Sequence, residues 1–181
     1  MAWINHGERE LYSSPWVTLG LADVEWPDGT RFDHHLIRCQ PAAGCIVIDP
    51  ERGVLLLWRH RFITDTWGWE IPAGRVDEGE SIVDAARRET LEETGWEPEG
   101  LTPLVDFYPS NGLSDQHFHV FVATGATHRG EPSDPNEADR VEWVSVEDLR
   151  EALRRGEMNE GLSVTACCYA LAFGAFGDLD A

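Results

Sequence analysis

The stretch that decides the fold is Gly74-Arg75-Val76-Asp77-Glu78-Gly79-Glu80-Ser81-Ile82-Val83-Asp84-Ala85-Ala86-Arg87-Arg88-Glu89-Thr90-Leu91-Glu92-Glu93-Thr94-Gly95-Trp96. Ser81 is a good N-cap, because its hydroxyl can accept from the unpaired N–H groups of a first helical turn, and Asp84 follows three residues later. Gly95 is a natural C-terminal stop, because glycine takes the left-handed conformation freely. The stretch therefore predicts a helix of about 13 residues between Ser81 and Gly95.

The glutamates of this helix continue its apolar side. At roughly 100° per residue, Glu89 and Glu93 point within about 20° of the direction of Ile82, and Glu92 points close by. A charged stretch is usually a solvated face, which would place the acids opposite the apolar residues. The observed pattern favours carboxylates that turn toward the protein.

Inward carboxylates repel one another and lose hydration, so they need a compensating cation. Spacings of three and four residues bring Glu89, Glu92 and Glu93 onto adjacent turns, close enough to share divalent ions. An all-oxygen ligand set with open water positions suits Mg²⁺ or Mn²⁺, and such ions commonly serve phosphates. The helix therefore predicts a Mg²⁺ (or Mn²⁺) site.

The charge balance of the whole chain excludes some classes of function. The 181 residues carry 14 Lys and Arg against 33 Asp and Glu, a formal net charge of −19. A chain this acidic is not expected to bind nucleic acid or an anionic membrane surface. Its length fits one domain with a modest appendage and a real hydrophobic core.

The cysteines and the N-terminus bear on the compartment. The spacing of Cys39, Cys45, Cys167 and Cys168 matches neither a zinc site nor a disulfide framework. The N-terminus lacks a basic region followed by an apolar run, and no stretch approaches the length of an apolar membrane span. We therefore expect a reduced, soluble, cytoplasmic protein.

Apolar runs on both sides of the helix predict a sheet. An N-terminal hairpin is expected from residues 15–24 and 30–39, joined by a turn at Trp26-Pro27-Asp28-Gly29. Residues 43–48 and 54–58 are continuous apolar runs, typical of a hairpin whose strands are buried on both faces. The other expected elements are strands at 101–108, 118–123 and 141–144, helices at 145–154 and 162–173, and an acidic loop at 129–139.

The spacing of Gly74, Glu80 and the run Arg88-Glu89-Thr90-Leu91-Glu92-Glu93-Thr94-Gly95 resembles the signature of the Nudix hydrolase family, G-x5-E-x7-R-E-U-x-E-E-x-G-U, where U is a bulky aliphatic residue. All the glycine and charged positions match. Thr90 and Trp96 depart from the pattern at the two U positions, which bear on packing rather than on metal chemistry. The resemblance implies an α+β fold, an α/β/α sandwich around a mixed β-sheet, with an N-terminal β-hairpin subdomain.

The resemblance also implies metal-dependent hydrolysis of a nucleoside diphosphate linked to another group. Matched by position, Glu89, Glu92 and Glu93 are the metal-site carboxylates. The backbone carbonyl of Ala73 is similar to one that ligates metal in family members. Arg88 would orient the glutamates and partly neutralise them.

The flanking sequence looks like the ADP-ribose pyrophosphatase branch of the family. The run Trp69-Glu70-Ile71-Pro72-Ala73-Gly74 resembles that branch's L-E-x-P-A-G, and residues 108–115 resemble its Y-x-S-P-G-x-S-[DE], with Asn111 where proline is usual. The second match makes Ser110 a candidate for substrate binding. In this branch the N-terminal strands help to build a homodimer with shared active sites. The resemblance therefore implies a homodimer, with residues 1–39 as an N-terminal dimerisation subdomain and 40–181 as the Nudix hydrolase domain.

Two arginines and two tryptophans near the box are further candidates for substrate binding. Arg59 and Arg61 stand two residues apart and so share one face of their strand. By resemblance Arg61 matches an arginine that contacts substrate phosphate, whereas Arg59 could equally cover a sheet edge. Trp67 and Trp69 could stack on the base or line the pocket, with packing against the sheet as the alternative.

The general base is expected outside the box. Many ADP-ribose pyrophosphatases take it from a glutamate on a loop, and Glu137 lies in the matching acidic loop, with Glu142 as the runner-up. A solvated loop acid is the alternative reading of Glu137.

Together these features predict a cytoplasmic, homodimeric Nudix pyrophosphohydrolase that cleaves ADP-ribose or a related nucleotide sugar to AMP and a sugar phosphate. Metal ions at the glutamates would lower the pKa of a bound water and clamp the phosphates. Two alternatives stay open: hydrolysis of damaged nucleoside triphosphates, and a non-catalytic Nudix domain that senses a nucleotide.

Overall fold

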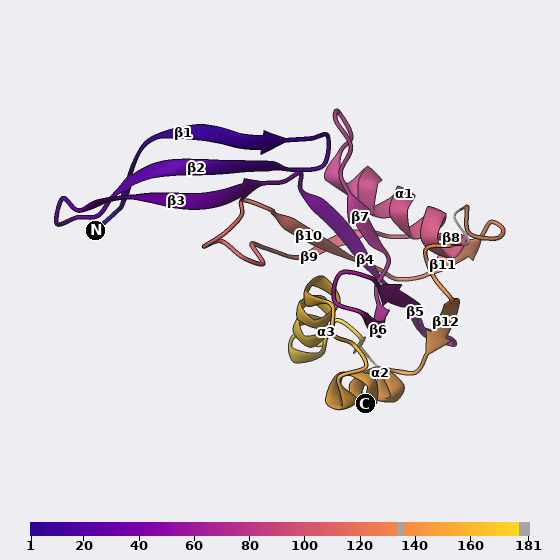
Figure 1. The fold of residues 1–181 in the computed structure, drawn as a ribbon. Helices are drawn as coiled ribbons and strands as arrows, with labels where there is room; N and C mark the ends of the chain where they lie inside the picture. Colours follow the sequence, from indigo (N-terminus) through magenta and orange to yellow (C-terminus); the bar gives the residue numbers. More distant parts are fainter. Residues whose placement is uncertain (134–135, 178–181) are drawn as a thin grey trace. The chain divides into compact units, whose positions relative to one another are not determined.

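The computed structural model describes residues 1–133 and 136–177, and the chain divides into two compact units (Figure 1). The first unit consists of Met1–Pro41 and Tyr108–His117. The second consists of Ala42–Phe107 and Phe118–Ala181, and it holds the glutamate helix.

The first unit is a three-stranded antiparallel sheet in the order β1-β2-β3, formed by β1 (Ile4–Ser13), β2 (Thr18–Glu25) and β3 (Arg31–Arg38). The last two are the expected hairpin. Its turn is closed by the Trp26 N–H, which donates to the Thr30 carbonyl at 2.8 Å, and Gly29 has a φ of 85°. The sequence does not predict β1, because every residue of this strand is exposed and no apolar alternation marks it.

The segment 108–117 attaches to β3 of the same unit. The Ile37 N–H donates to the Leu113 carbonyl at 2.8 Å, and the Asp115 N–H donates back to Ile37 at 3.2 Å. The Asp115 carboxylate also accepts from Arg38 Nη1 at 3.0 Å and from the Cys39 N–H at 2.9 Å. These bonds fix a segment far away in the sequence against the N-terminal sheet.

The second unit is built on a seven-stranded mixed sheet with the main order β12-β5-β4-β10-β9, in which β6 pairs with β5 and β7 with β4. The β4–β10 pair is parallel and the others are antiparallel. A separate ribbon joins β8 (Trp96–Pro98) to β11 (Ala126–His128). The strands of the mixed sheet are β4 (Ala42–Asp49), β5 (Gly53–Arg61), β6 (Thr66–Glu70), β7 (Ala73–Arg75), β9 (Thr102–Phe107), β10 (Phe118–Ala123) and β12 (Arg140–Val144).

The strands β4 and β5 form only a short hairpin. They pair at Ile48–Val54 and Asp49–Gly53, after which β4 pairs with β10 and β5 with β12 and β6. The sequence does not predict the short strands β6, β7, β8 and β11, because three to five residues carry too little pattern to be recognised.

The three helices begin and end close to their predicted positions. In α1 (Ile82–Thr94), Ser81 Oγ accepts from the Asp84 N–H at 3.2 Å, and Gly95 ends the helix with a φ of 74°, which confirms both expected caps. The others are α2 (Val146–Arg155), which is capped by Ser145, and α3 (Gly161–Ala172). Within the described part of the chain, no helix has the length and apolarity to cross a membrane.

The helices cover both faces of the mixed sheet (Figure 1). The α1 side packs a core of Ala43, Cys45, Val47, Leu55, Ala85, Ala86 and Phe121. The α2 and α3 side packs a second core of Ile46, Ile48, Leu56, Val120, Leu149, Leu162 and Ala166. Successive residues of β4 and β5 thus enter opposite cores, which explains their continuous apolar runs. The predicted α/β/α sandwich around a mixed sheet is confirmed.

Candidate metal and catalytic site

Glu93 is the most deeply buried carboxylate of α1, with 4% of its surface exposed. Its Oε1 accepts from Arg59 Nη2 at 2.8 Å, and its Oε2 accepts from the Ala73 backbone N–H at 2.9 Å. Burial raises the pKa of Glu93 to about 7, although Arg59 and the Ala73 N–H oppose the rise. The carboxylate is therefore fixed inward, as the sequence predicts.

Glu89 lies against the loop that precedes the helix. A Cβ at Gly74 would overlap the carboxyl group of Glu89, so any larger residue there would displace this carboxylate from its position. Burial raises the pKa of Glu89, and the Arg88 guanidinium opposes that rise. The first glycine of the Gly74–Trp96 stretch and the first of its three candidate metal ligands therefore lie in direct contact.

Arg88 links the loop to the glutamates. Its Nε and Nη2 donate to the two oxygens of Glu80, both at 2.9 Å, and its Nη1 donates to Glu89 at 2.8 Å and Glu92 at 3.0 Å. Pairing with Glu80 raises the pKa of Arg88 and lowers that of Glu80. The orienting contacts expected of Arg88 are present.

The prediction that Glu92 turns inward is wrong, because 47% of its side chain is exposed. At roughly 100° per residue Glu92 points about 80° away from Ile82, on the flank of the apolar side. Its contact with Arg88 still keeps it beside Glu89.

Arg59 lies among carboxylates and is only 5% exposed. Besides Glu93, its Nε donates to the Glu137 carbonyl at 2.8 Å, and its Nη2 lies 3.5 Å from Glu137 Oε2. Its Nη1 lies 3.8 Å from Glu70. Little of this guanidinium is accessible to a substrate, and its contacts bring Glu137, the candidate base, to the glutamate site.

Arg61 lies on the same face of β5, with 47% of its side chain exposed. Its Nε and Nη2 donate to the two oxygens of Glu70 at 2.9 and 2.5 Å. Glu70 is 2% exposed, and the sequence analysis assigns it no role. The register of the β5–β6 hairpin would have revealed Glu70. This residue pairs with Leu57, and paired residues share a face, so Glu70 lies on the same face as Arg59 and Arg61.

Trp67 and Trp69 lie on the opposite face of the same two strands. Trp69 pairs with Trp58 and Trp67 with His60, at ring distances of 5.1 and 5.2 Å. The Arg140 guanidinium lies 5.3 Å from the ring centre of Trp58. The structure therefore does not bring either tryptophan to the α1 glutamates. Pairing of Glu142 with Leu56 puts the runner-up base on this face too.

Ser110 belongs to the first unit, in the segment 108–117. Its carbonyl accepts from the N–H groups of Leu113 and Ser114 at 2.9 and 2.8 Å, which closes a turn. Its role in substrate binding stays a prediction.

The donor set fits a hard divalent cation. Glu89, Glu92 and Glu93 offer carboxylate oxygens, and the space that a Gly74 Cβ would fill lies directly at Glu89. The Glu93 carboxylate also accepts a hydrogen bond from the backbone N–H of Ala73. Within the described residues, no sulfur atom or imidazole takes part in these contacts, so an oxygen-seeking ion such as Mg²⁺ or Mn²⁺ suits the site.

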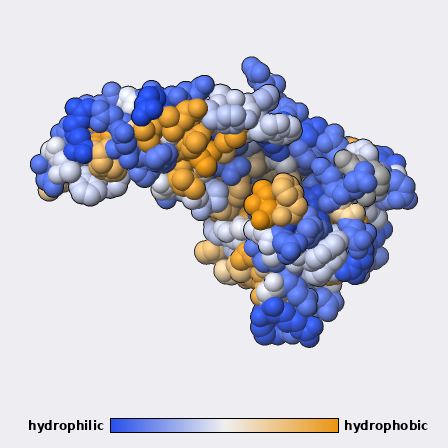
Figure 2. All heavy atoms as spheres, in the orientation of Figure 1, coloured by the Kyte–Doolittle hydropathy of each residue, from blue (hydrophilic) through white to orange (hydrophobic). Residues whose placement is uncertain are grey.

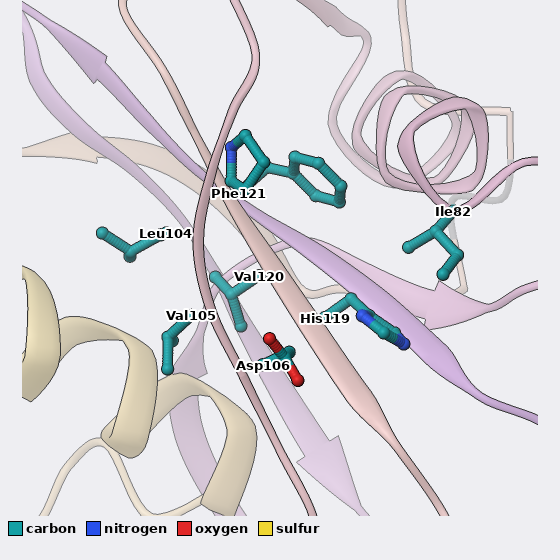
Figure 3. Close-up of a pocket in the computed structure, with 8 residues that line it drawn as sticks. Ile82, Leu104, Val105, Asp106, His119, Val120 and Phe121 are labelled. Atoms are coloured by element: carbon teal, nitrogen blue, oxygen red, sulfur yellow. The ribbon is translucent and has the colours of Figure 1, made fainter.

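Two cavities flank α1. One, of about 350 Å³, is lined by Glu93, Trp96, His128 and Asp139 among other residues. The other, of about 240 Å³, lies between Ile82 at the start of α1 and the strands β9 and β10, where Asp106 and His119 face each other across the ladder (Figure 3). Only the first cavity reaches a box glutamate.

Comparison with known proteins gives consistent results. The family description "NUDIX domain" matches residues 39–162. A Streptomyces rubellomurinus protein named CMP-5'-(N-acetyl-N-hydroxy-3-aminopropyl)phosphonate hydrolase is 38% identical over 156 residues, which cover 86% of this chain and 76% of the relative. An ADP-ribose pyrophosphatase of Bacillus subtilis is 29% identical over 153 residues, 84% of this chain and 82% of the relative. A crystal structure titled ADP compounds hydrolase superposes with a TM-score of 0.81 at 22% identity, covering 98% of this chain and 97% of that one.

Proposed function

The chain belongs to the Nudix family as a hydrolase of the ADP-ribose pyrophosphatase type, and we propose that it cleaves the diphosphate of ADP-ribose or of a related nucleoside diphosphate sugar. The products are AMP (or another NMP) and a sugar phosphate, and the cofactor is Mg²⁺ or Mn²⁺.

The observation that carries the proposal is the arrangement of Glu93 and Glu89 against the Ala73–Gly74 backbone. A buried carboxylate is costly unless a cation compensates it. Among the residues that the structure describes, Glu93 forms its ion pair with Arg59, while Arg88 is shared by Glu80, Glu89 and Glu92. This excess of acid supports a site that is completed by divalent cations.

In the proposed mechanism, Glu89, Glu92, Glu93 and the Ala73 carbonyl would hold the metal. A bound metal would lower the pKa of a water molecule and neutralise charge on the diphosphate. The carboxylate of Glu137, which lies near the glutamates through its contact with Arg59, would accept a proton from the attacking water. Arg61 donates to a substrate phosphate.

The test is turnover by the purified chain of a substrate panel with Mg²⁺, Mn²⁺ or EDTA, with products identified by chromatography. The proposal expects AMP and ribose phosphate from ADP-ribose, dependence on metal, and slower use of triphosphates. Preference for triphosphates would favour the sanitising alternative, and tight nucleotide binding without turnover would favour the sensing alternative.

A second candidate substrate rests on the 38% identity to the Streptomyces protein, whose name describes a CMP-linked phosphonate. That identity is higher than the 29% to the Bacillus subtilis ADP-ribose pyrophosphatase. The panel therefore includes a CMP-linked phosphonate, and a kcat/KM that exceeds the value for ADP-ribose would select this candidate.

We further propose a homodimer built through the N-terminal strands, with residues 1–39 as the dimerisation subdomain and 40–181 as the hydrolase domain. Large aromatic side chains are exposed in this unit, including Trp3 at 58%, which lies against Trp26 and Phe32, and Tyr12 at 59%. Hydrophobic residues also reach the surface over the N-terminal strands (Figure 2). Exposed apolar area of this kind marks association surfaces. Light scattering after size exclusion tests it: a mass twice the chain's 20.3 kDa is expected, and the monomer mass would contradict it.

We propose a cytoplasmic location because the cysteines are unpaired. Cys39, Cys45, Cys167 and Cys168 are all free thiols, as a reducing compartment would keep them.

A further inference from the structure

A buried carboxylate between two arginines has no part in the mechanism above. Glu70 ends β6, pairs with Leu57 of β5, and is 2% exposed. A carboxylate buried to this degree is tolerated only when it is paired and hydrogen-bonded. Its partners are Arg61, through two hydrogen bonds, and Arg59, at 3.8 Å.

The two bonds to Arg61 have the geometry of a bidentate pair. They join Nε to Oε1 at 2.9 Å and Nη2 to Oε2 at 2.5 Å. Such a pair fixes the plane of a guanidinium, which a single bond would not do. The pairing raises the pKa of Arg61 further, so the group stays charged.

Arg61 still has capacity for a second anion. Glu70 uses two of the five N–H donors of a guanidinium. With 47% of its side chain exposed, Arg61 also reaches solvent, while Glu70 does not. The charge of Glu93 acts on Arg61 as well, which places this cation within the field of the metal carboxylates.

We infer that Glu70 is a positioning residue, which holds the Arg61 guanidinium in a fixed orientation so that its remaining donors meet the diphosphate of the substrate. This inference rests on the proposed function. Glu70 itself acts through Arg61 and touches no reacting atom. Preorganised donors cost less entropy on binding than mobile ones, so the contribution belongs to substrate binding.

The test is a double-mutant cycle on ADP-ribose hydrolysis with Mg²⁺, using Glu70→Gln, Arg61→Ala and the double variant. Glu70→Gln keeps the shape of the side chain and removes its charge. We expect KM to rise about tenfold in each single variant, with kcat within about threefold, because a bidentate charged contact is lost. In the double variant KM should match that of Arg61→Ala, because Glu70 then has nothing to orient.

Two further variants serve as controls. Glu151→Gln makes the same change in a partly exposed carboxylate that pairs with Arg154 and Arg155, and it should keep the wild-type KM. Arg61→Lys keeps the charge on an exposed side chain but loses the planar fork, so it should raise KM even if Glu70→Gln does not fold.

Wild-type KM in Glu70→Gln or in Arg61→Lys would overturn the inference. A fall in the kcat of Glu70→Gln at unchanged KM would also overturn it, because that would indicate an effect through Arg59 and Glu93. So would a rise in KM that Glu70→Gln causes equally in the wild type and in Arg61→Ala. Absence of turnover in the wild type would instead refute the proposed function, so the two failures are distinguishable.

Discussion

The two faces of the β5–β6 hairpin differ completely in chemistry. One carries Arg59, Arg61 and Glu70 and meets Glu93 of α1. We call this set, together with the Glu93 side chain that it contacts, the charged face. The other, the aromatic face, carries Trp58, His60, Trp67 and Trp69 with Arg140 of β12.

The difference follows from the alternation of side chains along a strand. The sequence Trp58-Arg59-His60-Arg61 changes face at every residue, so a nearly continuous run of functional-looking residues is divided into two sets. Nearness to the family box along the chain therefore does not place a residue at the site. The predictions below test whether the charged face alone serves the reaction.

The largest difference is expected when an arginine is replaced by methionine on each of the two faces. Arg59→Met leaves the buried carboxylates Glu93 and Glu70 without their shared cation, which should lower the free energy of unfolding by about 3–5 kcal/mol at pH 8 without metal. Arg140→Met removes cation–π contacts at an exposed edge and should cost about 1 kcal/mol or less. Urea denaturation measures both. Equal losses would remove the distinction between the faces.

Glu93→Gln tests the charged face in catalysis. An amide cannot replace the charge of a metal-site carboxylate, so kcat with Mg²⁺ should fall by about 10²- to 10³-fold. Steady-state hydrolysis of the preferred substrate is the assay, with Glu151→Gln as a control that should retain the wild-type kcat. A kcat within a few-fold of wild type would mean that Glu93 is not an essential ligand.

The charged face should also make stability depend on pH. The folded pKa of Glu93, about 7, exceeds its ordinary value of 4.5, so between these values the folded state binds more protons than the unfolded state. Stability should therefore fall as pH rises from 5 to 8, by about 2–3 kcal/mol for this group. Burial raises the pKa of Glu89 as well, in the same direction.

Urea unfolding of the metal-free protein at pH 5 and pH 8 measures this difference. Glu93→Gln should abolish most of it, and Glu151→Gln should leave it unchanged. Saturating Mg²⁺ should reduce it too, because the metal favours the ionised carboxylate. The same pH difference in wild type and Glu93→Gln would exclude Glu93 as its source.

The smallest expected effect is on the aromatic face. Trp67 is half exposed and stacks near Trp58 and His60, so Trp67→Ala should change KM for ADP-ribose by no more than about threefold, and stability by about 1 kcal/mol. A tenfold rise in KM would show that this tryptophan contacts the substrate after all, and would end the division between the faces.

Local signals account for what the sequence predicts well. The side chain of Ser81 caps the start of α1, and the left-handed backbone of Gly95 ends the helix. Both ends can therefore be predicted without knowledge of the tertiary structure. Helix geometry likewise predicts the inward Glu89 and Glu93. The prediction of an inward Glu92 fails because the same geometry puts this residue on the flank of the apolar side.

Tertiary pairing accounts for what the sequence misses. The role of Glu70 and the position of Trp67 both depend on the register of the β5–β6 hairpin, which the turn between the strands fixes. β1 is held by pairing with β2 rather than by burial, so its own residues carry no apolar pattern. The link between Arg59 and Glu137 joins residues 78 positions apart, and no spacing rule reveals it.

Direct metal binding tests the central claim, that the carboxylates of α1 on the charged face hold a divalent ion. Electron paramagnetic resonance of Mn²⁺ titrated into the wild type, Glu93→Gln and Trp67→Ala measures it at pH 8. The account predicts wild-type affinity in Trp67→Ala and an affinity at least about tenfold weaker in Glu93→Gln. Equal affinity in wild type and Glu93→Gln would contradict it.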